Sequence, residues 1–294
     1  MPLIPQSPQW SFYRVLVSPM GTIGGFHLPW AIAAFGAFGV QYIAPYHVRF
    51  RWGPSGDLMG LTSQYLYVQS LRDRSMRALT TPTGSDLYWS PCGDYSALDR
   101  ALGAQYGNSS DLVLVEVRSA RVQRLLGPWA PILAIDGLCW SPFRDEIAFI
   151  PRSGVYPIEI FKVSTGLPPT PAVFGSIVPG TTIKVRLRSA PDANRPYVVG
   201  AALGRDRGIA TARGRIPLDP DPLLGASLSG IAPFRGFQGA LDANGRADAF
   251  IDVPSVSALE GLRIFVGYVT LDPAQPGGLA TISGSIPVFV QPTW

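Results

Sequence analysis

Carboxylates in the C-terminal third of the chain have the residue types and spacing best suited to chemistry. They form two groups, one between alternating prolines and one around a hairpin turn: Asp219 and Asp221 in the first, Asp242, Asn244 and Asp248 in the second. Oxygen-rich loops bind Ca²⁺, and a carboxylate pair can act as acid and base on glycosides. The alternative is structural, because aspartates cap turns and prolines stiffen loops. We expect the structural role, with Ca²⁺ as the weaker candidate.

Nucleophilic catalysis is not expected. A serine nucleophile needs a base within reach, usually a histidine. The chain has only His27 and His47, both in an N-terminal stretch without charged residues, and it contains no Gly-x-Ser-x-Gly motif. Glycine-rich phosphate-binding motifs are also absent from the sequence. We therefore predict no catalytic residue, no organic cofactor and no enzymatic activity.

Charge and cysteine content narrow the choice of partners. The net charge is +4, but only 15% of the residues are charged and the arginines are scattered, with no basic run that could follow phosphates. Nucleic acid is therefore not an expected partner. Cys92 and Cys139 are too few for a four-ligand zinc site. A disulfide is one alternative for them, and two buried free thiols are the expectation.

A six-residue turn motif occurs three times in the first half of the chain. Each copy has Trp, Pro and Asp at one spacing: Trp52, Pro54 and Asp57; Trp89, Pro91 and Asp94; Trp140, Pro142 and Asp145. Apolar, β-branched segments follow at 64–71, 111–117 and 157–163, and shorter ones at 76–80 and 122–126. Proline presets the turn, glycine supplies a positive φ, and tryptophan fills the space between neighbouring sheets. These residues are expected to be structural.

The motif and its following strands resemble the WD-like repeat of the Tol-system β-propeller and of the propellers in prolyl oligopeptidase-type peptidases. The resemblance covers about residues 47–166 and implies blades of antiparallel strands. A closed propeller needs at least four blades. Only three repeats are recognisable, and the third has Arg144 in place of the turn glycine. The array is therefore predicted to be incomplete or degenerate, with open sheet edges suited to pairing with another chain.

The first 46 residues allow two interpretations. No charged residue lies between Arg14 and Arg49, and residues 23–44 are apolar enough to be considered for a membrane. Prolines and glycines interrupt that stretch, which favours a buried part of the fold that could supply a fourth blade. The alternative is an export signal or anchor, although a clean signal peptide is not recognisable. A membrane partner is expected only if this segment is an anchor.

A second β-module is predicted after a proline-rich linker at 168–174. Residues 175–294 contain seven apolar or alternating runs separated by turn residues: 181–189, 197–203, 223–228, 237–241, 247–253, 262–271 and 280–290. Seven short strands at this spacing indicate a β-sandwich. Leu241, Asp242, Gly245 and Ala247, followed by Pro254, resemble a C-terminal module of large secreted proteins from planctomycete- or myxobacterium-like bacteria, which implies a surface or secreted context.

The sequence thus predicts an all-β protein in three parts: residues 1–46, propeller-like repeats at 47–167, and the linker followed by the sandwich. The expected function is that of a non-enzymatic structural or interaction protein of the bacterial cell surface or extracellular space. Its partner would be a protein, with self-assembly through open edges as one form. A carbohydrate- or peptide-binding propeller fragment is the alternative, and a hydrolase remnant is a remote one.

Overall fold

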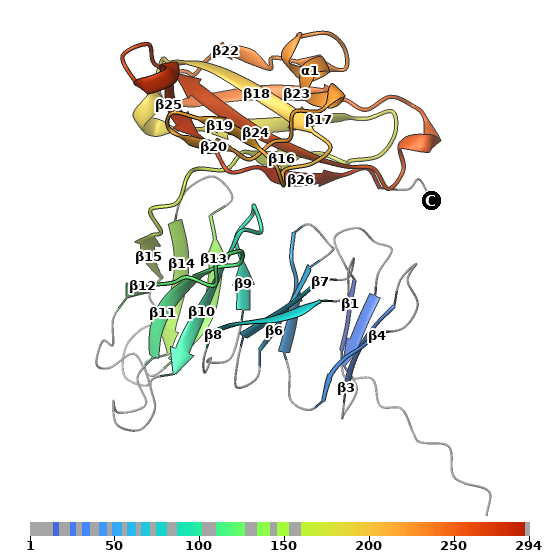
Figure 1. Ribbon diagram of the computed structural model, residues 1–294, viewed down its shortest axis with the longest axis vertical. Helices are drawn as coiled ribbons and strands as arrows, with labels where there is room; N and C mark the ends of the chain where they lie inside the picture. The colour runs from blue at the N-terminus through green and yellow to red at the C-terminus, as the bar shows by residue number, and fades with distance from the viewer. Residues whose placement is uncertain are drawn as a thin grey trace, which may run out of the picture.

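The computed structural model describes residues 14–17, 24–27, 31–35, 41–45, 49–54, 58–62, 66–70, 75–80, 87–101, 110–126, 134–141, 146–152 and 160–291. The chain forms two parts, a row of small antiparallel sheets and a C-terminal module that lies along one side of that row, above it in Figure 1. The prediction of an all-β fold with propeller-like repeats is confirmed. Asp57, Pro142, Asp145 and His47 lie outside the described residues.

The N-terminal apolar stretch forms a four-stranded sheet in simple meander order. Its strands are β1 (Arg14–Val17), β2 (Gly24–His27), β3 (Ala31–Phe35) and β4 (Gln41–Pro45). Neighbouring strands in sequence pair antiparallel throughout. This sheet adds a fourth unit to the three repeats recognised from the motif.

Among the described residues, no helix is long and apolar enough to cross a membrane.

Each Trp-Pro motif joins the first and second strands of one of the next three sheets. The second sheet consists of β5 (Arg49–Trp52), β6 (Leu58–Thr62), β7 (Leu66–Ser70) and β8 (Met76–Thr80). The third consists of β9 (Leu87–Trp89), β10 (Tyr95–Ala101), β11 (Ser110–Glu116) and β12 (Val122–Leu126). The fourth has three described strands, β13 (Ala134–Trp140), β14 (Glu146–Arg152) and β15 (Phe161–Ser164). The motif tryptophan is the last residue of the first strand each time.

Tryptophan hydrogen bonds join successive sheets at equivalent positions. Nε1 of Trp89 donates to the carbonyl oxygen of Arg51 at 3.1 Å. Nε1 of Trp140 donates in the same way to the carbonyl oxygen of Tyr88 at 2.9 Å. Each indole therefore reaches the residue that precedes the tryptophan of the sheet before it, so the first strands of the three sheets lie next to one another.

Apolar clusters fill the spaces on both sides of the third sheet. Leu98, Val113 and Val115 point towards the second sheet, where they pack with Val68 and Leu79. The alternate positions point the other way: Ala97 and Leu112 pack with Leu138, Ile147 and Phe149 of the fourth sheet. Strand β11 is thus buried on both faces. This explains its nearly continuous run of apolar residues.

The four sheets follow one another in a row, with β1–β4 at one end and β13–β15 at the other (Figure 1). No strand pairing joins the first and last sheets among the strands that the structure describes. The first and last described sheets lie at opposite ends of the row in Figure 1, which agrees with the predicted incomplete array.

The C-terminal module consists of two antiparallel sheets that share one core. The first has the order β16 (Ala172–Phe174), β17 (Thr182–Arg188), β23 (Arg246–Asp252) and β21 (Phe234–Arg235). The second has the order β22 (Gln238–Ala240), β18 (Pro196–Ala202), β24 (Arg263–Leu271) and β25 (Leu279–Ile282), and β26 (Ile286–Phe289) also pairs with β24. A separate hairpin joins β19 (Ile209–Thr211) and β20 (Gly214–Ile216). Three short 3₁₀ turns complete the module: Ala190–Asp192, Ser257–Leu259 and Pro276–Gly278.

The module core lies between the two sheets. Strand β17 alternates buried and half-exposed residues, with Ile183, Val185 and Leu187 buried. They pack with Val199 of β18, Val266 of β24 and other buried side chains of both sheets. This period-two alternation is the pattern from which the strand was predicted.

Three details differ from the expectation for this module. Residues 223–228 belong to a helix, α1 (Pro222–Leu228), instead of a strand. Asp221 caps it by accepting a hydrogen bond from the amide of Leu224. Pro222 is the first helical residue, a position where a backbone N–H would have no partner within the helix. Strand β16 begins inside the range expected for the linker, and the run at 280–290 is divided between β25 and β26.

Candidate functional site

The repeat turn of the third sheet meets the C-terminal module through one arginine. Arg205 follows β18, and its Nη1 donates to the carbonyl oxygen of Cys92 at 2.6 Å. Its two terminal nitrogens also lie 3.2 Å from the two carboxylate oxygens of Asp94. The guanidinium stacks 5.3 Å from the ring centroid of Phe265, and the side chain is only 11% exposed. Arg205 thus ties the second Trp-Pro turn to the module.

Other contacts at the junction are closer to solvent or made by backbone. Arg118 pairs with Asp206 at 3.0 Å, and both side chains are at least half exposed. The amide of Gly284 donates to the carbonyl oxygen of Pro169 at 3.0 Å. A Cβ on Gly284 would lie 3.0 Å from Cγ2 of Thr170, so the linker passes close to the module at this glycine.

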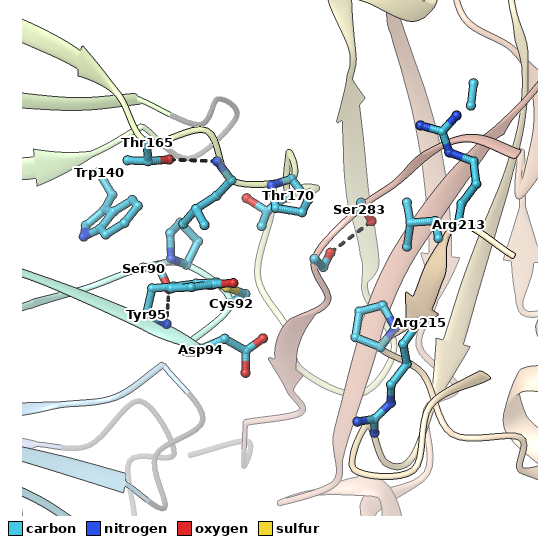
Figure 2. Close-up of a pocket in the computed structure, with 17 residues that line it drawn as sticks. Ser90, Cys92, Asp94, Tyr95, Trp140, Thr165, Thr170, Arg213, Arg215 and Ser283 are labelled. Carbon is cyan, nitrogen blue, oxygen red and sulfur yellow. Dashed lines mark hydrogen bonds between the residues drawn. The ribbon is translucent and has the colours of Figure 1, made fainter. Parts of the chain in front are cut away.

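A pocket of about 350 Å³ lies at this junction. One wall is the repeat turn from Ser90 to Tyr95 with Trp140, and the opposite wall comes from residues 213–217 and 280–284 of the module. The segment between Thr165 and Thr170 closes the space between them (Figure 2). The volume is at the lower end of the range of small-ligand sites.

The pocket combines an apolar surface with two cations. Trp140, Leu167 and Ile282 supply apolar and aromatic area. Arg213 and Arg215 are exposed, and their guanidinium groups lie at opposite ends of the module wall in Figure 2. Arg213 lies in the turn of the hairpin and Arg215 lies in β20, with Gly214 between them.

The partners of the two arginines are neutral. Nη1 of Arg213 donates to the side-chain oxygen of Gln275 at 2.5 Å. Nη2 of Arg215 donates to the carbonyl oxygens of Arg205, at 3.1 Å, and Asp206. Within the described part of the chain, neither guanidinium has a carboxylate partner, whereas Arg205 is neutralised by Asp94. The pocket therefore carries positive charge that favours an anionic ligand.

The titratable groups of the opposite wall do not supply a nucleophile. Burial raises the pKa of the Cys92 thiol, and the charge of Asp94 raises it further. The thiol therefore stays protonated, and a protonated thiol is a poor nucleophile. Burial also raises the pKa of Tyr95, with a further contribution from Glu116. The hydroxyl of Thr170, which is 7% exposed, makes no hydrogen bond to any described residue, so it can bond to a ligand.

The motif residues take part in both structure and pocket. Trp52 ends β5 and is half-buried, and Pro54 lies 3.3 Å from where a Cβ on Gly93 would sit. Pro91, Asp94 and Trp140 line the pocket, which their assignment as purely structural residues did not anticipate. Gly93 has φ +75°, the positive value expected of the turn glycine.

The residues proposed for calcium make hydrogen bonds within the module. Asp219 accepts from the amides of Arg207 and Gly208 at 2.7 and 2.9 Å. Burial opposes its ionisation, but these amide bonds outweigh burial and lower the pKa of Asp219. Besides capping α1, Asp221 accepts from the amide of Leu203 at 2.6 Å.

The polar residues around the hairpin turn also make hydrogen bonds within the module. Asp242 accepts from the amides of Asn244 and Arg246 at 2.8 and 2.7 Å, so Asn244 takes part through its backbone. Asp248 accepts two hydrogen bonds from Arg186, which lower its pKa. Among the described residues, no group of three or more His, Cys, Asp or Glu side chains is placed to hold a metal ion. Calcium binding remains a prediction that these contacts do not support.

The two cysteines are free thiols, and only one of them is buried. Cys92 lies in the repeat turn, where its sulfur is 3.3 Å from Oγ of Ser90. Cys139 is exposed, which corrects the expectation of two buried thiols. It precedes Trp140 in β13, so the tryptophan and the cysteine point to opposite faces of the strand. His27 is the last residue of β2.

Sequence reasoning missed Arg205, Arg213 and Arg215. Arg205 contacts residues more than a hundred positions earlier in the chain, so no local motif marks it. The alternation of Arg213 and Arg215 around a glycine was the only signal in the sequence, and many exposed hairpins show the same pattern.

Comparison with known proteins yields structural similarity only. No protein-family model and no curated protein matches the chain. A solved protein described as TolB, from Agrobacterium tumefaciens, is 14% identical with a TM-score of 0.40, over 97% of this chain and 86% of that one. The β-propeller domain of the Trilobed protease from Pyrococcus furiosus is 13% identical with a TM-score of 0.42, over 61% and 64%. The extracellular domain of a one-component system from B. thetaiotaomicron is 10% identical with a TM-score of 0.35, over 96% and 37%. Similarity at this level assigns no function.

Proposed function

We propose that this chain is a non-enzymatic interaction protein whose junction pocket binds a short acidic segment of a partner protein. The observation that carries the proposal is the pair Arg213 and Arg215, two cations without a carboxylate partner among the described residues, on one wall of a pocket with an aromatic opposite wall. Guanidinium groups bind carboxylates through paired, charge-assisted hydrogen bonds. A segment with an apolar side chain between two acidic residues fits this arrangement.

The apolar part of the ligand has a defined place. Trp140 is held by its hydrogen bond to Tyr88, so its ring is fixed before a ligand arrives. A fixed aromatic surface loses little conformational entropy on binding. The hydroxyl of Thr170, which has no hydrogen-bond partner among the described residues, supplies a further polar contact in the same pocket.

The test uses fluorescent pentapeptides with a central Trp or Leu flanked by Glu, matched to peptides with Gln in place of Glu. Fluorescence anisotropy with the full chain should detect the Glu peptides and not the Gln peptides. Arg213→Ala and Arg215→Ala should each weaken binding about tenfold, the effect of one charge-assisted hydrogen bond. Arg121→Ala, at an exposed arginine immediately before β12, is the matched control. Equal binding of Glu and Gln peptides, or no effect of either pocket variant, would contradict the proposal.

A second candidate function is self-assembly, favoured by the fourth sheet. This sheet has three described strands where the other three sheets have four, and β15 forms its last strand. A strand edge without a neighbour can accept a strand of another chain. Analytical ultracentrifugation should then show concentration-dependent oligomers that Lys162→Pro in β15 abolishes. A monomer at all concentrations would exclude this function.

We also propose that the protein acts at the bacterial cell surface or in the extracellular space. The support is the low content of charged residues and the resemblance of residues 241–254 to a module of secreted proteins. Cell fractionation, with mass and N-terminal sequencing of the native protein, tests this location. Recovery in the cytosol with an intact N-terminus would contradict it.

A further inference from the structure

The junction pocket contains a carboxylate of its own. Asp94 lies on the repeat wall and is the only acidic residue among the described residues that line the pocket. Its side chain is 27% exposed and extends from the repeat turn towards the module in Figure 2. An unpaired carboxylate at this position would repel an anion and offset one of the two cations on the opposite wall. The charge of Asp94 therefore bears directly on which ligands the pocket can hold.

Arg205 cancels this charge without lining the pocket itself. Its two terminal nitrogens each lie 3.2 Å from a different carboxylate oxygen of Asp94, so the pair has the two-point geometry of a guanidinium fork. The same guanidinium is fixed by the carbonyl oxygen of Cys92 at 2.6 Å and by the ring of Phe265. The pair is therefore already formed before a ligand enters the pocket.

The loop 204–208 positions Arg205 together with one of the pocket cations. Nη2 of Arg215 donates to the backbone carbonyl oxygens of Arg205 and Asp206 in this loop. The loop in turn is held by Asp219, which accepts hydrogen bonds from two of its amides at 2.7 and 2.9 Å. One loop thus keeps Arg215 in the pocket wall and directs the side chain of Arg205 to the repeat turn.

We infer that Arg205 determines the charge selectivity of the junction pocket by neutralising Asp94. With the pair formed, Arg213 and Arg215 face a wall without net charge, and an anion between the walls meets no repulsion. Without Arg205, the carboxylate of Asp94 repels the same anion across a partly desolvated space. The inference rests on the proposed function, in which the anion is an acidic peptide segment, and adds the residue that makes the pocket select it.

A purely structural role of Arg205 predicts a different outcome. Arg205 also ties the module to the repeat turn through the carbonyl of Cys92, and losing this bond would loosen the pocket wall whatever the charge of Asp94. Asp94→Asn removes the charge but does not restore the tie. Adding this substitution to Arg205→Ala therefore separates the effect of charge from the effect of structure.

The test compares Arg205→Ala with the double variant Arg205→Ala/Asp94→Asn in the anisotropy assay with the full chain. The measured quantity is the affinity for the Glu-flanked peptide with a central Trp. Arg205→Ala should weaken binding about tenfold, the effect of one unit charge at the pocket, and the double variant should return to within about threefold of the wild type. Asp94→Asn alone should tighten binding, because it leaves the charge of Arg205 uncancelled.

Arg118→Ala is the matched control. It also leaves a carboxylate, that of Asp206, without its arginine at the same junction. The side chain of Asp206 is 83% exposed and does not line the pocket, so solvent screens its charge. The affinity for the Glu peptide should change less than about twofold. Circular dichroism confirms that each variant is folded.

A second measurement reports the charge of the pocket without any peptide. Iodide quenching of Trp140 fluorescence is taken as the difference between each protein and its Trp140→Phe counterpart, with the neutral quencher acrylamide as the reference. Because Trp140 lines the pocket, its quenching by an anion depends on the local potential. The ratio of iodide to acrylamide quenching should fall about twofold or more in Arg205→Ala and recover in the double variant.

Failure of the inference and failure of the proposed function give different results. If the wild type binds no Glu peptide but iodide quenching follows the expected order, the proposed function is wrong and the inference holds. If the wild type binds the Glu peptide and Arg205→Ala does not weaken binding, or Asp94→Asn does not restore it, the inference is wrong. Equal iodide quenching in the wild type, Arg205→Ala and the double variant would also overturn the inference.

Discussion

The repeat sheets and the C-terminal module bury apolar side chains in different ways. In the repeats, separate clusters lie between neighbouring sheets, such as the one that joins Val68 and Leu79 to Leu98 of the next sheet. In the module, one large cluster draws on both sheets and on the loops around them, and a smaller one joins Leu218 and Leu224 to Phe265. Where each sheet contacts only its neighbours, the free energy of unfolding is a sum of local contributions. A domain whose sheets share a core unfolds as a unit instead. The comparison predicts local opening in the repeats and cooperative unfolding in the module.

The largest effect is expected from Phe237→Ala in the module. Phe237 is 2% exposed and its ring lies 4.8 Å from that of Phe234. Removing such a ring from a core costs about 3–5 kcal/mol. Hydrogen exchange followed by mass spectrometry should show faster exchange throughout residues 172–290. Faster exchange confined to the strands that touch Phe237 would contradict a single cooperative core.

Leu98→Ala makes the corresponding change in the repeats. Leu98 is fully buried between the second and third sheets, and its truncation should cost about 2–5 kcal/mol. Exchange should accelerate in those two sheets and stay unchanged in the module. If residues 172–290 also exchange faster, the two parts are coupled more strongly than their separate clusters imply.

Arg205→Ala tests the connection between the two parts. The change leaves the carboxylate of Asp94 and the carbonyl of Cys92 without their partner, at a cost of about 1.5–3 kcal/mol for hydrogen bonds to a charged group. Arg118→Ala removes an exposed ion pair at the same junction and should cost less than about 1 kcal/mol. Denaturant unfolding of both variants measures the difference. Equal costs would show that burial of Arg205 has no bearing on the junction.

Trp89→Phe is expected to have a smaller effect. It keeps an aromatic ring between the sheets but loses the hydrogen bond to the carbonyl of Arg51, which is worth about 1 kcal/mol. Thermal unfolding measures the loss. Trp140→Phe removes the equivalent bond and serves as the matched comparison, since similar losses are expected from equivalent positions. A loss in only one of the two variants would contradict the equivalence of the sheet contacts.

The sequence predicted the strands better than the site. The segments 76–80 and 122–126 coincide with β8 and β12, because alternating residues between clear turns fix a strand. Residues 223–228 were misassigned because a short apolar run does not distinguish helix from strand, although Asp221 and Pro222 carried a helix-start signal.

Sequence patterns could not predict the pocket, for a different reason. Its walls come from residues near 92, 140, 168, 215 and 282, which only the packing of the module on the third sheet brings together. The motif identified one wall, through Pro91, Asp94 and Trp140. The arginines of the other wall lie in an ordinary hairpin, so their role depends on position in the fold and not on spacing.

Both parts of the molecule contribute residues to the proposed ligand site. Hydrogen exchange of the full chain, with and without the Glu-flanked peptide with a central Trp, tests it most directly. Bound peptide should slow exchange in the repeat turn around residues 90–95 and also in residues 213–217 and 280–284 of the module. Protection in only one of the two parts, or none in either, would contradict a site shared between the repeats and the module.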